Sequence, residues 1–118
     1  MHEASIADSV LQIALSRLEE NGGFATVSTI DVAIGELRNV DPSSLQFAFD
    51  AIKPLYPGCS HCQLRINNIN SLAYCRKHGH EYHPTFADAF RCPACGAGIG
   101  RIVCGEELNV VNITFETD

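Results

Sequence analysis

The sequence predicts an α+β fold in which two helices pack against a three-stranded sheet, with a zinc-binding module inserted before the last strand. Two segments carry apolar residues at helical spacing, and three show the alternation and β-branched residues typical of strands. Residues 74–104 hold most of the cysteines and histidines but few aliphatic residues. We therefore expect an α/β domain formed by residues 1–73 and 105–118, and a zinc-binding module formed by residues 74–104.

The two helices have clear start and stop signals. Residues 4–20 place polar and apolar side chains on opposite faces, and Asn21-Gly22-Gly23 ends the helix because Asn and Gly accept the left-handed conformation. Asp41 is a good N-cap, and Pro42 fits the first position of a second helix. Pro54 closes that helix because it has no N–H to donate.

The three strands are expected over residues 24–37, 63–70 and 107–116. In the first of them Ile30 and Val32 alternate with polar or small residues, as in a strand with one buried face. Because the cysteine-rich segment separates the second strand from the third, the module is an insertion between two strands of the sheet.

Two short segments of the module have the form of metal-binding turns. In "CPACG" (92–96) two thiols separated by two residues reach one ion, and the following glycine lets backbone N–H groups turn toward sulfur. "CRKHG" (75–79) has the same form with histidine as its second ligand. Three thiolates and one imidazole suit tetrahedral zinc. The predicted zinc ligands are Cys75, His78, Cys92 and Cys95.

The fourth zinc ligand has competitors. We favour His78 because a glycine follows it, as one follows the second cysteine of the other turn, but His80 and His83 lie nearby. Cys59 and Cys62 form a further Cys-x2-Cys pair. That pair has three interpretations: a second metal site, a labile disulfide, or, as we favour, thiols exposed near the start of a strand. Cys104 is interpreted as an ordinary small residue.

Composition excludes several classes of function. The net charge of −6 disfavours nucleic acid as a partner, because an acidic domain repels phosphates. No apolar run approaches the ~20 residues that span a membrane, and the charged N-terminal segment is unlike a signal peptide, so we expect a cytoplasmic protein. No nucleophile–base pair or phosphate-binding loop stands out, and we expect no enzymatic activity.

The first three residues offer a second set of metal donors. The α-amine of Met1, together with the amide nitrogen and imidazole of His2, forms fused chelate rings around one ion, and Glu3 supplies a fourth donor. Square-planar nitrogen ligation is typical of Ni(II) and Cu(II), which displace an amide proton more readily than Zn(II) does. Taken alone, a histidine at position two is also typical of a solvated chain end.

The segments "MHEASIADSV", "IGELRNVDPSSLQFAFD" and "GEELNV", with the paired ligand module, resemble the HypA/HybF family of hydrogenase nickel-incorporation proteins. The resemblance covers essentially the whole chain and implies a nickel metallochaperone with a separate structural zinc site. By motif, the nickel residues correspond to Met1, His2 and Glu3, and Asp41 occupies a place where the family often has an acidic residue. It also implies two partners, a nickel-handling GTPase and a hydrogenase large-subunit precursor.

The chain departs from that family in two places. The family usually has cysteine where this chain has His78, so His80, His83, Cys59 and Cys62 all compete for the place of the fourth zinc ligand. The Cys59-x2-Cys62 pair is also outside the family pattern. The alternative function is a zinc-ribbon adaptor that binds proteins without transferring nickel. A thiol-redox enzyme using Cys59 and Cys62 is a third hypothesis, but no thioredoxin-like βαβ context surrounds the pair.

Overall fold

A computed structural model describes residues 2–22 and 25–117 of the chain. The chain divides into two compact units. The first comprises residues 1–33, 40–67 and 109–118, and the second comprises residues 34–39 and 68–108. The second unit therefore takes in the predicted module together with short flanking segments on either side of it. Among the described residues, no helix combines the length and the apolar character needed to cross a bilayer.

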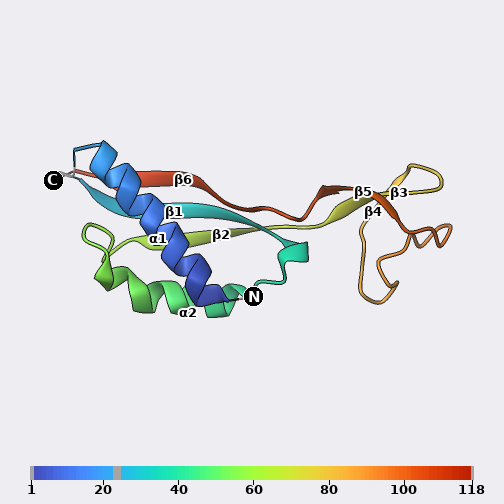
Figure 1. Cartoon of the computed structure of the whole chain (residues 1–118), viewed down its shortest axis with the longest axis horizontal. Helices are drawn as coiled ribbons and strands as arrows, with labels where there is room; N and C mark the ends of the chain where they lie inside the picture. The colour runs from blue at the N-terminus through green and yellow to red at the C-terminus, as the bar shows by residue number, and fades with distance from the viewer. Residues whose placement is uncertain (1, 23–24, 118) are drawn as a thin grey trace. The chain divides into compact units, whose positions relative to one another are not determined.

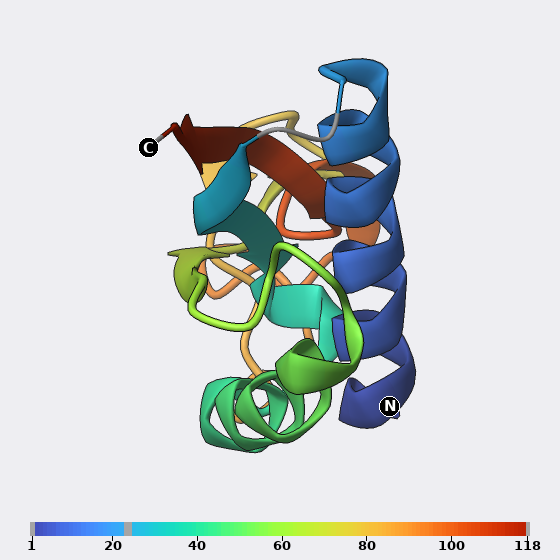
Figure 2. The same ribbon diagram turned by 90° about the vertical axis from the view of Figure 1, so that its left-hand side faces the viewer.

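The first unit contains both α-helices and a three-stranded sheet (Figure 1). The strand order in the sheet is β2-β1-β6, and Figures 1 and 2 show both helices on the same face of it. This arrangement confirms the predicted fold class of two helices on a three-stranded sheet. The elements are α1 (Glu3–Glu20), β1 (Thr26–Gly35), α2 (Pro42–Ile52), β2 (Gln63–Ile69) and β6 (Leu108–Glu116).

The sheet is mixed in direction. The Ser28 hydroxyl donates to the carbonyl of Thr114 near one end of β1, and the Gly35 N–H donates to the carbonyl of Glu107 at the other end. As the residue numbers rise along β1, the residue numbers of the bonded partners fall, so β6 runs antiparallel to β1. The α2 helix connects β1 to β2, as a crossover between parallel neighbours does.

The core of this unit lies between the helices and the sheet. Leu11 of α1, Ile30 of β1, and Leu45 and Phe49 of α2 are each 0 % exposed. The start of α2 is fixed by Asp41, whose carboxylate accepts the Ser43 N–H at 3.1 Å. The predicted N-cap is therefore confirmed, and its carboxylate offsets the unpaired N–H groups of the first turn.

The second unit contains a smaller antiparallel sheet in the order β4-β3-β5. These strands are too short to be predicted from the sequence. Its core is small, consisting of the buried residues Ala73, Cys75, Tyr82 and Cys92. The strands are β3 (Leu72–Cys75), β4 (Glu81–Tyr82) and β5 (Ile99–Cys104). The second unit also contains the 3-10 turn Glu36–Arg38, and the first unit contains the 3-10 turn Lys53–Leu55.

Two glycines hold backbone segments of the second unit close together. A Cβ at Gly35 would lie 2.0 Å from the carbonyl oxygen of Gly105, and a Cβ at Gly105 would lie 2.6 Å from Ser71 Cα. Gly105 also has a φ of 113°, which favours glycine. Side chains at either position would separate segments that this part of the fold brings into contact.

Candidate metal centre

Both predicted metal-binding turns are present, and they have the same backbone form. The Gly79 N–H donates to the Cys75 carbonyl at 2.8 Å, and the Gly96 N–H donates to the Cys92 carbonyl at 2.7 Å. Both glycines are left-handed, with φ of 73° and 75°. In the first turn the backbone N–H of His78 also points at Cys75 Sγ, 3.4 Å away. These turns direct N–H groups toward sulfur, as expected for thiolate ligands.

The pairing of β3 with β4 brings His80 to the thiols. Tyr74 faces Glu81 in the ladder, and the Cys75 N–H donates to the His80 carbonyl at 2.8 Å, so Cys75 and His80 are the next facing pair. Facing residues of antiparallel strands project to the same side. The His80 Nε2 consequently lies 2.8 Å from Cys92 Sγ.

Four donor atoms converge at this point. Among the described residues, one group of at least three candidate donors lies within 4.8 Å of one another, and its members are Cys75, His80, Cys92 and Cys95. Cys75 Sγ and Cys95 Sγ are 3.2 Å apart. Ligand atoms of tetrahedral zinc lie about 3.3–3.8 Å apart, as follows from bond lengths near 2.0–2.3 Å. Three thiols and one imidazole that lie within 4.8 Å of one another reach this spacing with small side-chain movements, so the set fits a structural zinc ion.

The structure thus places His80 in the cluster at the position for which the sequence favoured His78. The ring of His78 stacks parallel to the ring of His80 at a centroid distance of 6.0 Å and is outside the donor group. His78 lies within the turn, whereas His80 follows the turn and faces Cys75, so the imidazole of His80 is the one that reaches the thiols. His80 could have been identified from the sequence by assuming a hairpin turn over Arg76–Gly79, because such a turn places residue 80 opposite residue 75.

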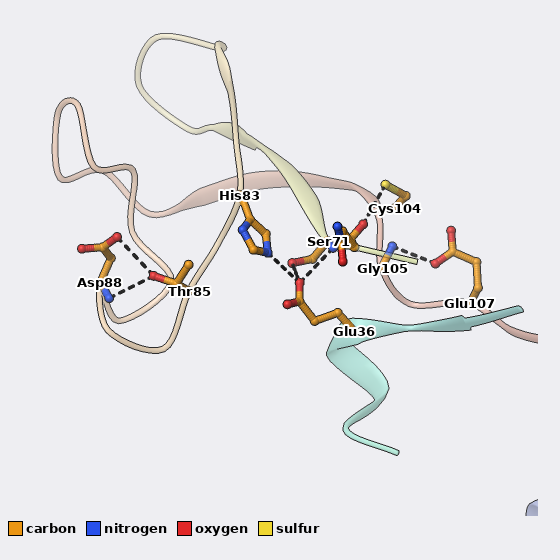
Figure 3. A network of polar contacts seen from close by, with 9 residues as sticks. Glu36, Ser71, His83, Thr85, Asp88, Cys104, Gly105 and Glu107 are labelled. Atoms are coloured by element: carbon orange, nitrogen blue, oxygen red, sulfur yellow. Dashed lines mark hydrogen bonds and ion pairs between the residues drawn. The ribbon is translucent and has the colours of Figure 1, made fainter. Parts of the chain in front are cut away.

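The third candidate, His83, has a different partner (Figure 3). Its Nε2 lies 2.7 Å from Glu36 Oε1, and the same oxygen accepts the Ser71 hydroxyl at 2.5 Å and the Ser71 N–H at 2.9 Å. The two bonds from Ser71 contribute most and the bond from His83 contributes less, and together they lower the pKa of Glu36 to about 2. His83 is therefore part of a carboxylate network rather than of the thiol cluster.

The thiol cluster favours the charged form of one cysteine. The N–H of His78, with smaller contributions from Cys95 and Lys77, lowers the pKa of Cys75 to about 7 despite the cost of burial. Thiolate is the form that binds a metal ion. The first turn therefore supplies a thiolate near neutral pH before any metal arrives, and zinc displaces fewer protons on binding.

The N-terminal residues meet the start of α2. His2 is the exposed N-cap of α1, and Glu3 is its first helical residue. Glu3 Oε2 accepts the backbone N–H of Asp41 at 3.2 Å, so the N-termini of the two helices are joined by a carboxylate. Three of the four predicted nickel residues, His2, Glu3 and Asp41, are thus neighbours in the first unit. Met1, the fourth, lies outside the described residues.

Of the three cysteines outside the cluster, two are buried where the sequence predicted exposed thiols. Cys59 and Cys62 are each 0 % exposed, so the interpretation of this pair as exposed thiols is wrong. The segment forms a tight turn, with the Cys62 N–H on the Cys59 carbonyl at 3.1 Å, and both are free thiols. Hydrogen bonding from Cys62 lowers the pKa of Cys59, but the pair precedes a strand rather than a helix. Cys104 is half-buried and donates weakly to the Asn70 carbonyl at 3.4 Å.

Comparison with known proteins places these features in one family. A family profile described as "Hydrogenase/urease nickel incorporation, metallochaperone, hypA" matches residues 1–115. The chain is 33 % identical to "Hydrogenase maturation factor HypA" of Desulfosudis oleivorans over 116 residues, covering 98 % of this chain and 99 % of the relative. It is 35 % identical to the protein of the same description from Geobacter metallireducens, covering 98 % of this chain and 100 % of that relative.

Two solved structures share the fold. The solution structure of the Ni metallochaperone HypA from Helicobacter pylori is 23 % identical, with a TM-score of 0.68 and full coverage of both chains. A second solution structure, of "HypA protein", is 22 % identical with a TM-score of 0.72, covering 100 % of this chain and 98 % of the other. Because the family profile matches nearly the whole chain, the chain belongs to the HypA family of hydrogenase/urease nickel-incorporation metallochaperones.

Proposed function

We propose that this metallochaperone binds Ni(II) at its N-terminus through Met1, His2, Glu3 and Asp41, and delivers it for the maturation of a [NiFe]-hydrogenase. The observation that carries the proposal is the bond from the Asp41 N–H to the Glu3 carboxylate, which gathers the predicted donors of two distant segments. The family assignment supports nickel as the cargo.

The backbone at His2 is suited to the predicted chelate. The His2 carbonyl accepts the first helical bonds, from Ser5 at 3.1 Å and Ile6 at 3.2 Å. The N–H of an N-cap residue takes no part in the helical ladder, so nickel could displace its proton without breaking the helix. The carboxylates of Glu3 and Asp41 offset the partial positive charge of the two helix N-termini, which would otherwise repel a cation.

We further propose that zinc is held by Cys75, His80, Cys92 and Cys95 and that it is structural. All four positions are occupied by protein donors, which leaves no open place for chemistry. The module buries too little apolar surface to fold stably without such a link. In this proposal the zinc-bearing unit presents the protein to its partners, which are a nickel-handling GTPase and a hydrogenase large-subunit precursor.

The test is nickel binding by the untagged, zinc-loaded protein, measured by equilibrium dialysis with metal analysis. We expect one tightly bound nickel in addition to one zinc. His2→Ala should abolish the nickel and leave the zinc. His61→Ala is the matched control, because His61 is an exposed histidine in the same unit, and it should change neither metal. Undiminished nickel in the His2 variant would place the site elsewhere.

Transfer is tested separately from binding. The untagged protein should restore hydrogenase activity to cells that lack their own family member, and the His2→Ala variant should not. A zinc-ribbon adaptor, the alternative function, would restore activity equally well with either protein. Restoration of urease but not of hydrogenase would identify the other client class that the family description includes.

A further inference from the structure

The loop formed by residues 85–91 carries an exposed pair of aromatic rings. The side chain of Phe86 is 88 % exposed and that of Phe90 is 40 % exposed. The two rings meet edge to face, with centroids 6.0 Å apart. Neither belongs to the buried cluster of this unit. Clustered aromatic side chains on a surface are typical of protein-binding sites, because they supply much of the binding energy there.

The backbone of this loop is held in an unfavourable conformation. Ala89 and Phe90 have φ of 52° and 63°, in the left-handed region that residues with side chains rarely adopt. The Phe90 N–H donates to the Thr85 carbonyl at 2.8 Å, and the Thr85 hydroxyl donates to the Asp88 carboxylate at 3.1 Å (Figure 3). These bonds fix the loop, so the exposed ring is held in place. Strain maintained in this way is characteristic of functional sites.

A hollow of about 350 Å³ lies beside the ring of Phe90. Its other walls include Arg76, Arg91 and the backbone of residues 96–98. No atom lies within 4 Å of the place where a Cβ of Gly96 would be, and the nearest atom to that of Gly98 is the guanidinium of Arg76 at 3.9 Å. The hollow is therefore lined by one aromatic residue, small residues and two arginines.

Positive charge lines this hollow. Of the residues that line it, Arg76 and Arg91 are charged and none is acidic, although the whole chain has a net charge of −6. Guanidinium groups bind carboxylates through two parallel hydrogen bonds. The carboxylate of Asp88, the acidic residue of the loop, accepts the Thr85 hydroxyl and, within the described part of the chain, forms no ion pair with Arg76 or Arg91.

We propose that the Phe86–Phe90 ring pair and the adjacent hollow bind an acidic segment of a partner protein that also carries an apolar side chain. Carboxylates of the segment pair with Arg76 and Arg91, and the apolar side chain packs against Phe90. The site requires the folded, zinc-bound module and does not require nickel. A polyanion such as nucleic acid is less favoured, because the acidic remainder of the chain repels it over a longer range.

The test is an NMR titration of the isotope-labelled, zinc-loaded protein with the peptide acetyl-EELFEE-amide. We expect saturable shifts confined to Arg76 and residues 85–99. Phe86→Ser and Arg91→Gln should each weaken binding by at least about fivefold, the range expected of contacts at an interface centre. Arg101→Gln is the matched control. It removes the same charge from the same unit, but Arg101 lies over the ring of Tyr74, 4.8 Å from its centroid, so affinity should be nearly unchanged.

Several outcomes would overturn the proposal. Equal losses in the Arg91 and Arg101 variants would indicate general charge attraction, and equal binding of a peptide with Gln in place of Glu would remove the role of the carboxylates. Tighter binding of oligothymidine to the same residues would identify nucleic acid instead. Zinc content is measured for every variant. If Arg91→Gln loses zinc, Phe86→Ser decides the matter, because a side chain that is 88 % exposed contributes little to folding.

Discussion

Replacing His80 by alanine is expected to weaken zinc binding by about 100-fold. Zinc binding to small structural modules is worth about 10–16 kcal/mol at neutral pH, or about 2.5–4 kcal/mol for each of four ligands. Water replaces the lost imidazole and recovers part of this, so a loss of about 3 kcal/mol is reasonable, and each 1.4 kcal/mol is about tenfold in affinity. His80 is exposed, so removing its ring leaves no buried cavity and the loss reports ligation.

The matched control for this change is His78→Ala. His78 contributes its backbone N–H to Cys75 Sγ, and alanine keeps that N–H. Zinc affinity should therefore change little. Competition with a chromogenic chelator, at neutral pH under reducing conditions, gives both affinities on one scale. A loss in the His78 variant as large as that in the His80 variant would refute the ligand assignment made from the strand register.

Three further predictions concern folding. Gly35→Ala places a methyl group 2.0 Å from a carbonyl oxygen, so urea unfolding should show a loss of stability of about 2–4 kcal/mol. Gly98→Ala is the control and should be tolerated, because the atom nearest to the added methyl group is 3.9 Å away. Removing zinc with a chelator should raise amide exchange across 74–104 and leave the helices protected, and unchanged exchange there would contradict a metal-dependent module. The Ser71 bonds lower the pKa of Glu36 from its ordinary value of 4.5 to about 2, so the stability that they add is present above pH 4.5 and declines as the pH falls toward 2. In the Glu36→Gln variant, the free energy of unfolding should not show this decline when it is measured across an acid titration.

The helices and the larger sheet were predictable because their signals are local. The Asp41-Pro42 start of α2 needs a capping side chain and a proline, and both effects act within a few residues. The alternation in β1 and the glycines after α1 are local in the same sense. The boundaries of these elements agree with the prediction to within two residues for most of the chain, and the metal-binding turns were recognisable by their glycines.

The histidine that joins the thiol cluster was not predictable from its own surroundings. His78 and His80 both lie near Gly79, and the choice between them depends on which residue faces Cys75 in a hairpin of only a few residues. The strands of that hairpin are too short for periodicity to reveal them. The burial of Cys59 was missed for a related reason: a turn that lies against the core has no pattern of its own.

In the proposed zinc site, the facing of Cys75 by His80 would make the ion a check on chain alignment during assembly. A slip of one residue in the hairpin would turn the imidazole to the opposite side and leave three donors. A misaligned chain would then release zinc quickly, while the aligned chain would retain it. Each ligand pair closes a loop of only a few residues, so both form early and at small entropic cost. Metal residence time, rather than apolar burial, would then select the native alignment.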